Sequence, residues 1–147
     1  MLTGSPHLVD VEMHRSSELE EKVLTRTVSP NDIPEYLACA DLGLALRQPT
    51  FSMQGVSPIK LGEYLLCGLP IFATSGVGDT AIYSSDVGYL VDHANTDALT
   101  RAATWFTDHV LPAREHFRVR CREIGVRHHS LESSVNSYRK ALKNVSP

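Results

Sequence analysis

The sequence predicts an α/β fold in which helices cover both faces of a parallel sheet, and three observations support this prediction. Two short apolar runs, 42–46 and 70–74, have the pattern of strands that are buried on both faces. The segment 59–67, which lies between them, carries apolar residues at helical spacing. The connections between these segments are short, and alternation of strand, helix and strand is typical of a parallel βαβ unit. We therefore expect a three-layer parallel α/β domain.

Residues that start and stop helices set the limits of several elements. Asp32 is predicted to cap a helix that runs to about Ala40, with Pro34 in its first turn and Glu35 completing a capping box. Gly68 is predicted to end the helix over 59–67 in a left-handed conformation. Weaker patterns predict a strand within 2–13, a helical stretch at 16–22, a strand at 23–28, a short helix near 81–84 and an edge strand at 88–91.

The C-terminal third is predicted to be helical. Asn95 or Thr96 caps a helix to about His109, whose apolar stripe comprises Leu99, Ala102, Ala103, Phe106 and Val110. Pro112 ends this helix, and two more are predicted at 113–124 and 131–143. The apolar face of the last helix consists of Val135, Tyr138 and Leu142.

Composition excludes several classes of protein. A chain of 147 residues with 42% hydrophobic and 21% charged residues is typical of one globular domain. The net charge of -3, with no run of lysine or arginine, argues against a nucleic-acid partner. No apolar run approaches the roughly 20 residues that span a bilayer, and the start lacks the pattern of a signal peptide. The three separated cysteines (Cys39, Cys67 and Cys121) are predicted to be reduced core residues, so we expect a cytoplasmic protein.

The loops after Leu46 and Thr74 are the predicted ligand site, because open parallel sheets bind ligands beyond the carboxyl ends of their strands. The helix between these strands begins just after 57–58, and its free N–H groups and positive dipole end are suited to a diphosphate. Lys60 in the first turn adds a positive charge. Glu63, about one turn deeper, can accept hydrogen bonds from the two hydroxyls of a ribose.

These residues resemble a known family. Residues 57–74 read Ser-Pro-Ile-Lys-Leu-Gly-Glu-Tyr-Leu-Leu-Cys-Gly-Leu-Pro-Ile-Phe-Ala-Thr and closely resemble the donor-site segment of retaining GT-B glycosyltransferases, the large family 4-like group that includes sucrose, trehalose-phosphate and lipopolysaccharide-type transferases. Residues 33–46 are similar to the helix and strand that precede this site, and the similarity extends over roughly 28–142. The resemblance implies a Rossmann-like domain that forms the C-terminal half of a GT-B fold.

The resemblance also implies roles for individual residues. Glu63 binds the donor ribose, and the backbone of 57–59 meets the diphosphate. The family has a sugar-binding glutamate eight residues before the ribose-binding one, and here Gly55 occupies that position. The loop after the second strand approaches the sugar or phosphate. The predicted donor site thus consists of Gly55, Ser57, Pro58, Ile59, Lys60, Glu63, Gly78 and Asp79. The resemblance implies no metal and no cofactor beyond a nucleoside diphosphate sugar as donor substrate.

The acceptor-binding half of a GT-B enzyme has no counterpart in the sequence, nor does the first strand and helix of the donor half. We therefore expect residues 1–147 to form one partial domain that binds UDP or GDP and by itself transfers nothing. The expected partners are the nucleotide sugar, the acceptor-binding N-terminal half and a second copy of the chain held by exposed apolar surface. Peripheral membrane contact is expected only through the missing half.

Several alternatives remain open at this level. Gly55 in place of glutamate favours a noncatalytic binding or assembly module, and a sugar-nucleotide epimerase is a further alternative. Residues 76–81 match a loose dinucleotide-binding pattern, with Asp92 as the ribose-binding acid, but the segment that follows is too short for a crossover helix. The histidine pairs lack the spacing of a zinc site.

Overall fold

The computed structural model describes residues 22–24, 26–57, 59–80, 83 and 85–143. The chain forms two compact units, Met1–Glu35 and Tyr36–Pro147. The strand predicted within 2–13, most of the helical stretch at 16–22 and most of the short helix near 81–84 lie outside the described residues. At 23–28, where a strand is predicted, the described residues contain only a single bridge residue, Arg26.

A short helical segment contains the boundary between the units. The 3-10 helix η1 (Pro30–Asp32) leads into α3 (Ile33–Ala38). The predicted Asp32 cap is wrong, because the Ser29 hydroxyl accepts a hydrogen bond from the Asn31 N–H at 3.4 Å. The fixed backbone angle of Pro30 starts the helical turn earlier than the capping pattern around Asp32 suggests.

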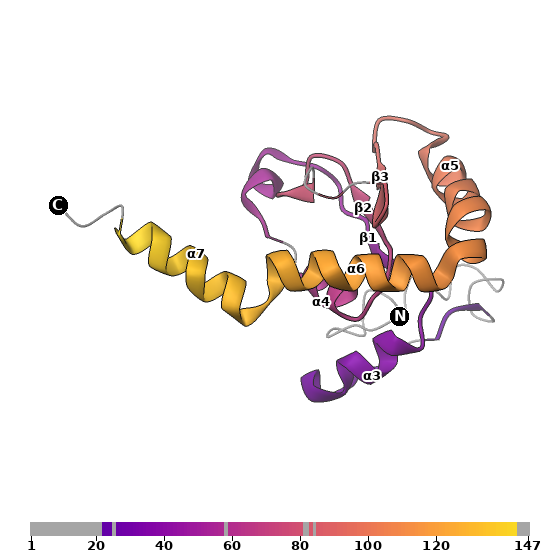
Figure 1. The fold of residues 1–147 in the computed structure, drawn as a ribbon. Helices are drawn as coiled ribbons and strands as arrows, with labels where there is room; N and C mark the ends of the chain where they lie inside the picture. The colour runs from indigo at the N-terminus through magenta and orange to yellow at the C-terminus, as the bar shows by residue number, and fades with distance from the viewer. Residues whose placement is uncertain (1–21, 25, 58, 81–82, 84, 144–147) are drawn as a thin grey trace. The chain divides into compact units, whose positions relative to one another are not determined.

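A parallel sheet forms the centre of the second unit (Figure 1). Strands β1 (Gly43–Ala45), β2 (Ile71–Thr74) and β3 (Gly88–Val91) pair in the order β1-β2-β3, and both pairings are parallel. Leu44 lies opposite Phe72, and Phe72 lies opposite Tyr89. The predicted α/β class and the βαβ unit are therefore confirmed.

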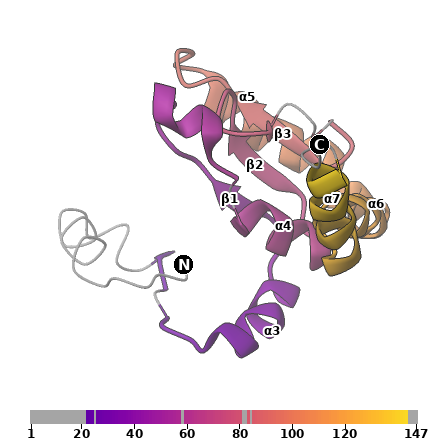
Figure 2. The same cartoon turned by 90° about the vertical axis from the view of Figure 1, so that its left-hand side faces the viewer.

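Helices cover both faces of this sheet, as the alternation along β2 requires. Ile71 and Ala73 point into one core with residues of α4 (Ile59–Leu66) and α6 (Arg114–His129). Phe72 points into the other core with Ala98 and Ala102 of α5 (Ala98–Trp105). Figure 2 shows α5 and α4 on opposite sides of the strands. The result is the expected three-layer, Rossmann-like arrangement.

The ends of two predicted helices differ from the sequence patterns. α5 begins at Ala98 after Asp97, because the Asn95 side chain accepts a hydrogen bond from the Asp97 N–H at 3.0 Å and forms a turn instead of a cap. Leu99 and Ala103, predicted for the buried stripe, are exposed. A π-helical turn (η4, Phe106–Val110) and a 3-10 turn (η5, Leu111–Ala113) lead into α6, which continues to His129.

The predicted burial of β1 is also only partly correct. Leu44 is 55% exposed and Leu46 is 41% exposed, although the apolar run predicted a strand covered on both faces. β1 pairs only with β2 among the described strands, so the cover that α5 gives to Phe72 does not extend to Leu44. An apolar run therefore indicates a strand here without indicating cover on both faces.

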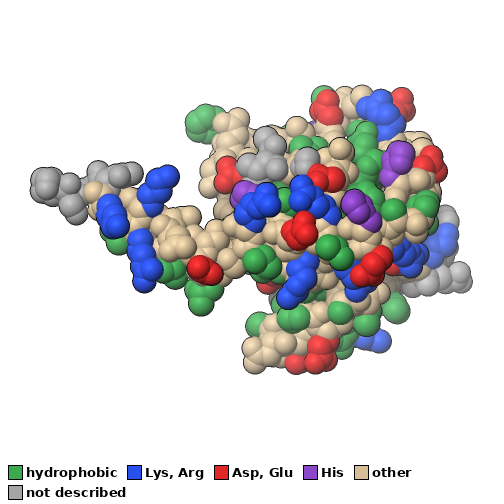
Figure 3. Space-filling model, viewed as in Figure 1, with side chains coloured by type: hydrophobic (Ala, Val, Ile, Leu, Met, Phe, Trp, Pro, Cys, Tyr) green, Lys and Arg blue, Asp and Glu red, His purple; other side chains and the backbone are tan. Residues whose placement is uncertain are grey.

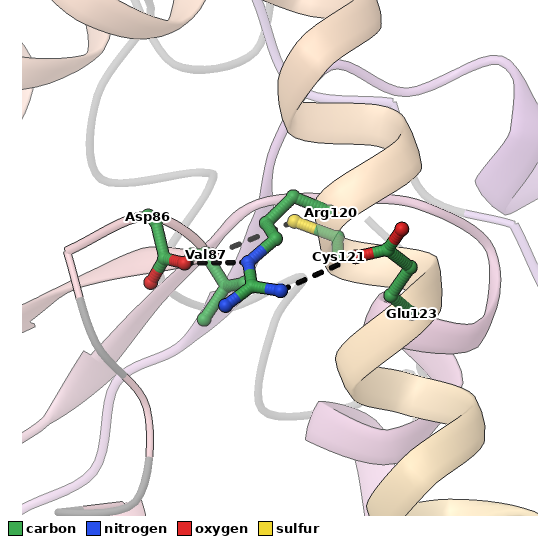
Figure 4. A network of polar contacts seen from close by, with 5 residues as sticks. All are labelled: Asp86, Val87, Arg120, Cys121 and Glu123. Atoms are coloured by element: carbon green, nitrogen blue, oxygen red, sulfur yellow. Dashed lines mark hydrogen bonds and ion pairs between the residues drawn. The ribbon is translucent and has the colours of Figure 1, made fainter.

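A polar clamp holds α6 against the segment before β3 (Figure 4). Arg120 donates to Asp86 at 2.6 Å and to Glu123 at 3.2 Å. Beside it, the Cys121 thiol donates to the Val87 carbonyl at 3.7 Å. Burial, with a smaller contribution from Asp86, raises the pKa of Cys121 to about 12, so this thiol is protonated. The prediction of a core cysteine is confirmed for Cys121 and wrong for Cys39, which is exposed.

A tyrosine–histidine pair joins α6 to the segment after β2, and the environment of its histidine predicts that stability depends on pH. The Tyr83 hydroxyl lies 2.8 Å from His129 Nε2, and burial, aided by His128, lowers the pKa of His129 below 6.5. Below pH 6.5 the unfolded chain binds a proton that the folded chain binds less readily. The free energy of unfolding should therefore fall as the pH drops from 6.5 toward the folded-state pKa.

Urea titrations at neutral and mildly acidic pH test this dependence. His129→Gln should reduce the loss of stability on acidification, whereas His109→Gln, at an exposed histidine, should leave it unchanged. An identical pH dependence in the parent and His129→Gln would contradict the assignment.

Candidate functional site

The carboxyl ends of β1 and β2 are held together by a threonine. The Thr74 hydroxyl accepts a hydrogen bond from the Arg47 N–H at 2.9 Å, and the Thr80 hydroxyl donates to the Thr74 carbonyl at 3.3 Å. Thr74 is only 3% exposed. The two loops selected from the sequence therefore leave the same edge of the sheet at one fixed point.

A second hydrogen bond joins these loops further from the sheet. The loop after β1 contains the 3-10 helix η2 (Phe51–Gly55), and the Gly78 N–H donates to the Met53 carbonyl at 2.8 Å. Gly78 has a φ of 54°, a left-handed conformation that favours glycine. The structure thus brings the predicted residues Gly55 and Gly78 into adjoining loops.

The amino terminus of α4 follows the loop that contains η2 and is accessible to solvent. Ser57 and Lys60 are exposed, and Ile59 is 78% exposed. Pro58 lies outside the described residues. Because the first N–H groups of a helix have no partner within it, this end presents donors and a positive dipole to a ligand. The first turn of α4 is therefore open to solvent at the carboxyl edge of the sheet.

Glu63 lies one turn further along α4 than the exposed residues Ile59 and Lys60. Leu61, Gly62 and Leu65 are buried, whereas Glu63 is half-buried. Burial, with a contribution from the negative charge of Glu63, raises the pKa of Tyr64. The Tyr64 hydroxyl donates to the Leu44 carbonyl at 3.3 Å and so connects α4 to β1.

Asp79 is exposed beside the hydrogen bond between Tyr83 and His129. Burial, with a smaller contribution from Asp79, raises the pKa of Tyr83 to about 12.

Three residues that shape this edge were not predicted from the sequence: Thr74, Met53 and Tyr83. The role of Thr74 could have been predicted, because a threonine at the end of a buried strand has a hydroxyl that needs a hydrogen-bond partner. The role of Met53 could not, because its backbone carbonyl makes the contact and any residue type has that group.

Two hollows lie elsewhere on the second unit. A cavity of about 270 Å³ is lined by Asp41 and Pro70, which precede β1 and β2, and by Arg114 and Arg118 of α6. A cleft of about 430 Å³ lies between α6 and α7 (Leu131–Lys143). None of the predicted donor-site residues lines either hollow.

Two features of the described residues concern metal binding and membrane crossing. Within these residues, no three His, Cys, Asp or Glu side chains are grouped so that they could hold a metal ion. No helix in the same ranges is both long and apolar enough to cross a membrane.

The sheet, its helical layers and the loops at its carboxyl edge define an α/β protein of Rossmann-like type. No family model matches the chain. Over 94 residues, the chain is 28% identical to the chitobiosyldiphosphodolichol beta-mannosyltransferase of Candida albicans, and the match covers 62% of this chain and 20% of that protein. The chain is thus distantly similar to a glycosyltransferase and spans about a fifth of its length.

Proposed function

We propose that this chain is the donor-binding part of a glycosyltransferase and that it holds a nucleoside diphosphate sugar for hexosyl transfer to an acceptor. The observation that carries the proposal is the exposed amino terminus of α4 at the carboxyl edge of the sheet, next to loops joined by the Gly78–Met53 hydrogen bond. The distant similarity to a mannosyltransferase supports the same class of reaction.

The diphosphate in this proposal binds at the start of α4. The free N–H groups of the first turn donate to phosphate oxygens, and the exposed Lys60 ammonium adds a full positive charge. Ser57 and Ile59 contribute backbone groups at the entrance to the helix. Gly78 and Asp79 border the same edge from the neighbouring loop.

Glu63 is proposed to bind the ribose of the donor. A carboxylate can accept hydrogen bonds from two neighbouring hydroxyls at once. Glu63 is half-buried, which limits competition from water for its carboxylate. The distance from the first turn to Glu63 is about one helical turn, roughly 5 Å, which suits the separation between a diphosphate and its ribose.

The chemical contribution of this part of the enzyme is positioning and charge stabilisation. Helix N–H groups and Lys60 stabilise the negative charge that develops on the departing diphosphate, without a covalent nucleophile or a metal. The acceptor and its binding half belong to the rest of the enzyme. The Candida protein is named as a β-mannosyltransferase, and the proposal commits to transfer of a hexose without specifying retention or inversion of configuration.

Calorimetric titration of the chain with UDP and GDP tests the donor site. Glu63→Gln should weaken binding of the preferred nucleotide by about 2 kcal/mol, roughly thirtyfold in Kd, because a charge-assisted acceptor of two hydroxyls is lost. Glu115→Gln, at an exposed glutamate of α6, is the matched control and should bind like the parent. Absence of nucleotide binding by the parent, or equal binding by Glu63→Gln and the parent, would overturn the proposal.

A noncatalytic binding module is the second candidate, and Gly55 is the observation that favours it. A Cβ atom built on Gly55 would meet nothing within 4 Å, so packing does not exclude a larger side chain at this position. Gly55→Glu should therefore fold with a stability within about 0.5 kcal/mol of the parent.

The same variant separates the two candidates. In a donor site, the added carboxylate should strengthen binding of a nucleotide sugar relative to the bare nucleotide. An unchanged ratio of the two affinities would favour the noncatalytic module.

A further inference from the structure

Helix α6 packs closely along α4, the helix that carries the proposed donor site. A Cβ atom at Gly125 would lie 2.7 Å from the backbone C of Leu65, so the two helix backbones are in direct contact there. Next to this contact, the Arg122 guanidinium donates to the Leu66 carbonyl at 2.6 Å. Figure 3 shows basic and acidic side chains along the outward face of α6, and the opposite face packs into the core with α4. α6 is therefore a close-packed support for α4.

His129, the last residue of α6, lies against the first half of α4. A Cβ atom at Gly62 would lie 3.0 Å from Cγ and 3.1 Å from Nδ1 of the His129 ring. Gly62 is buried, and in the chain it lies between Lys60 and Glu63, the two residues proposed to bind the phosphate and the ribose. Glycine at this position allows the His129 ring to lie directly on the helix beside the proposed site.

His129 also contacts Tyr83, in the segment that follows β2. The Tyr83 hydroxyl lies 2.8 Å from His129 Nε2, and the two rings are stacked, with centroids 6.1 Å apart and an interplanar angle of 30°. Tyr83 is only 7% exposed and belongs to the same core as Leu61 and Leu65 of α4. The ring of Tyr83 is thus packed between other elements, and its hydroxyl has its hydrogen-bond partner on α6.

Two hydrogen-bonded turns lead from Tyr83 back to the loop that borders the proposed site. The Tyr83 N–H donates to the Thr80 carbonyl at 3.1 Å, and the Thr80 N–H donates to the Val77 carbonyl at 3.3 Å. Val77 and Thr80 are each 2% exposed, whereas Asp79 is exposed. The loop is therefore fastened to the core on either side of Gly78 and Asp79.

We propose that Tyr83 and His129 are positioning residues, which hold the loop of Gly78 and Asp79 in the conformation that binds the diphosphate and sugar of the donor. This inference rests on the proposed function and adds to it the residues that fix one wall of the donor site. The loop and α4 belong to different segments, so their separation depends on a contact between them. α6 supplies this contact, because it packs on α4 and its last side chain holds Tyr83. A ligand binds more tightly to a loop that is already ordered, because no binding energy is used to order it.

Calorimetric titrations with UMP and UDP-glucose, and with GMP and GDP-mannose, test this role. Tyr83→Phe should weaken binding of the preferred nucleotide sugar by about five- to tenfold, because a hydrogen bond is lost and the loop then occupies its binding conformation for less of the time. Binding of the monophosphate of the same base should be unchanged, since α4 and Glu63 remain in place.

Substitutions at His129 separate the hydrogen bond from the packing of the ring. His129→Gln keeps an amide group that can meet the Tyr83 hydroxyl, and it should bind the nucleotide sugar like the parent. His129→Leu keeps an apolar side chain but has no polar atom, so it should lose affinity as Tyr83→Phe does. Tyr89→Phe is the matched control, because it removes a tyrosine hydroxyl next to Phe72 on the other face of the sheet, and it should bind like the parent.

Hydrogen exchange provides a measurement that does not involve the nucleotide. The Gly78 N–H donates to the Met53 carbonyl at 2.8 Å, so its exchange rate reports on opening of the loop. This amide should exchange at least about fivefold faster in Tyr83→Phe, whereas Tyr89→Phe should keep the parent's rate. Urea midpoints should show that every variant is folded under the conditions of the titrations.

The outcomes distinguish failure of this inference from failure of the proposed function. If Glu63→Gln weakens nucleotide binding but Tyr83→Phe binds the nucleotide sugar like the parent, the donor site stands and the positioning role is wrong. The positioning role is also wrong if Tyr83→Phe weakens the monophosphate and the nucleotide sugar equally. If the parent binds no nucleotide, the proposed function fails and this role fails with it.

Discussion

Phe72→Ala is expected to lower the free energy of unfolding by about 3–5 kcal/mol, the range typical of a buried phenylalanine. Phe72 is 7% exposed and lies at the centre of an aromatic cluster with Tyr89, Trp105 and Phe106, at ring-centroid distances of 6.3, 5.9 and 6.4 Å. Truncation would leave a cavity between β2 and α5 and remove three ring contacts. A domain with a typical stability of about 5–15 kcal/mol would lose a large part of it.

Urea denaturation followed by tryptophan fluorescence measures this loss, because Trp105 is the sole tryptophan and contacts Phe72 directly. Phe51→Ala is the matched control, since Phe51 is 90% exposed and its truncation should change stability by less than about 0.5 kcal/mol. Similar urea midpoints for the two variants would contradict the described core.

Gly125→Leu is expected to destabilise the second unit by at least about 3 kcal/mol, because it would force α4 and α6 apart. A Cβ atom at Gly125 would lie 2.7 Å from the backbone C of Leu65 and 2.7 Å from the backbone N of Leu66. Backbone atoms cannot move aside as a flexible side chain can. α4 carries the proposed donor site, so this substitution should also weaken nucleotide binding.

Gly55→Ala provides the comparison for Gly125→Leu. Gly55 has open space around its Cβ position and is absent from the described glycines with positive φ, so alanine should be neutral or slightly stabilising, by about 0.5 kcal/mol. Urea midpoints measure both effects. If Gly125→Leu unfolds at the same urea concentration as the parent, the close approach of α4 and α6 is wrong.

Local patterns predicted the elements that carry the proposed site. The helix predicted over 59–67 is observed as α4 (Ile59–Leu66), and Gly68 ends it with a φ of 77°. The strand predicted over 70–74 is observed as β2. These predictions succeeded because helical spacing, a glycine stop and a buried apolar run all depend on neighbouring residues.

Predictions of burial were less successful, because burial depends on which segments meet in space. Leu44 and Leu99 have the apolar character of core residues, but they are exposed on β1 and α5. Tyr138 belongs to an amphipathic stripe that the fold of the described residues leaves uncovered. An amphipathic pattern identifies the apolar face of a helix or strand, but it does not identify the segment that packs against that face.

The sequence by itself determined the parallel α/β class, the position of α4 between two strands, and the placement of Lys60 and Glu63 on successive turns, because these features follow from local spacing. Only the tertiary structure decided that Gly78 bonds to Met53, that Arg47 bonds to Thr74, and that α7 presents its apolar face outward. In both hydrogen bonds a backbone N–H group meets a partner far away in the chain, and that partner depends on the packing of the whole unit.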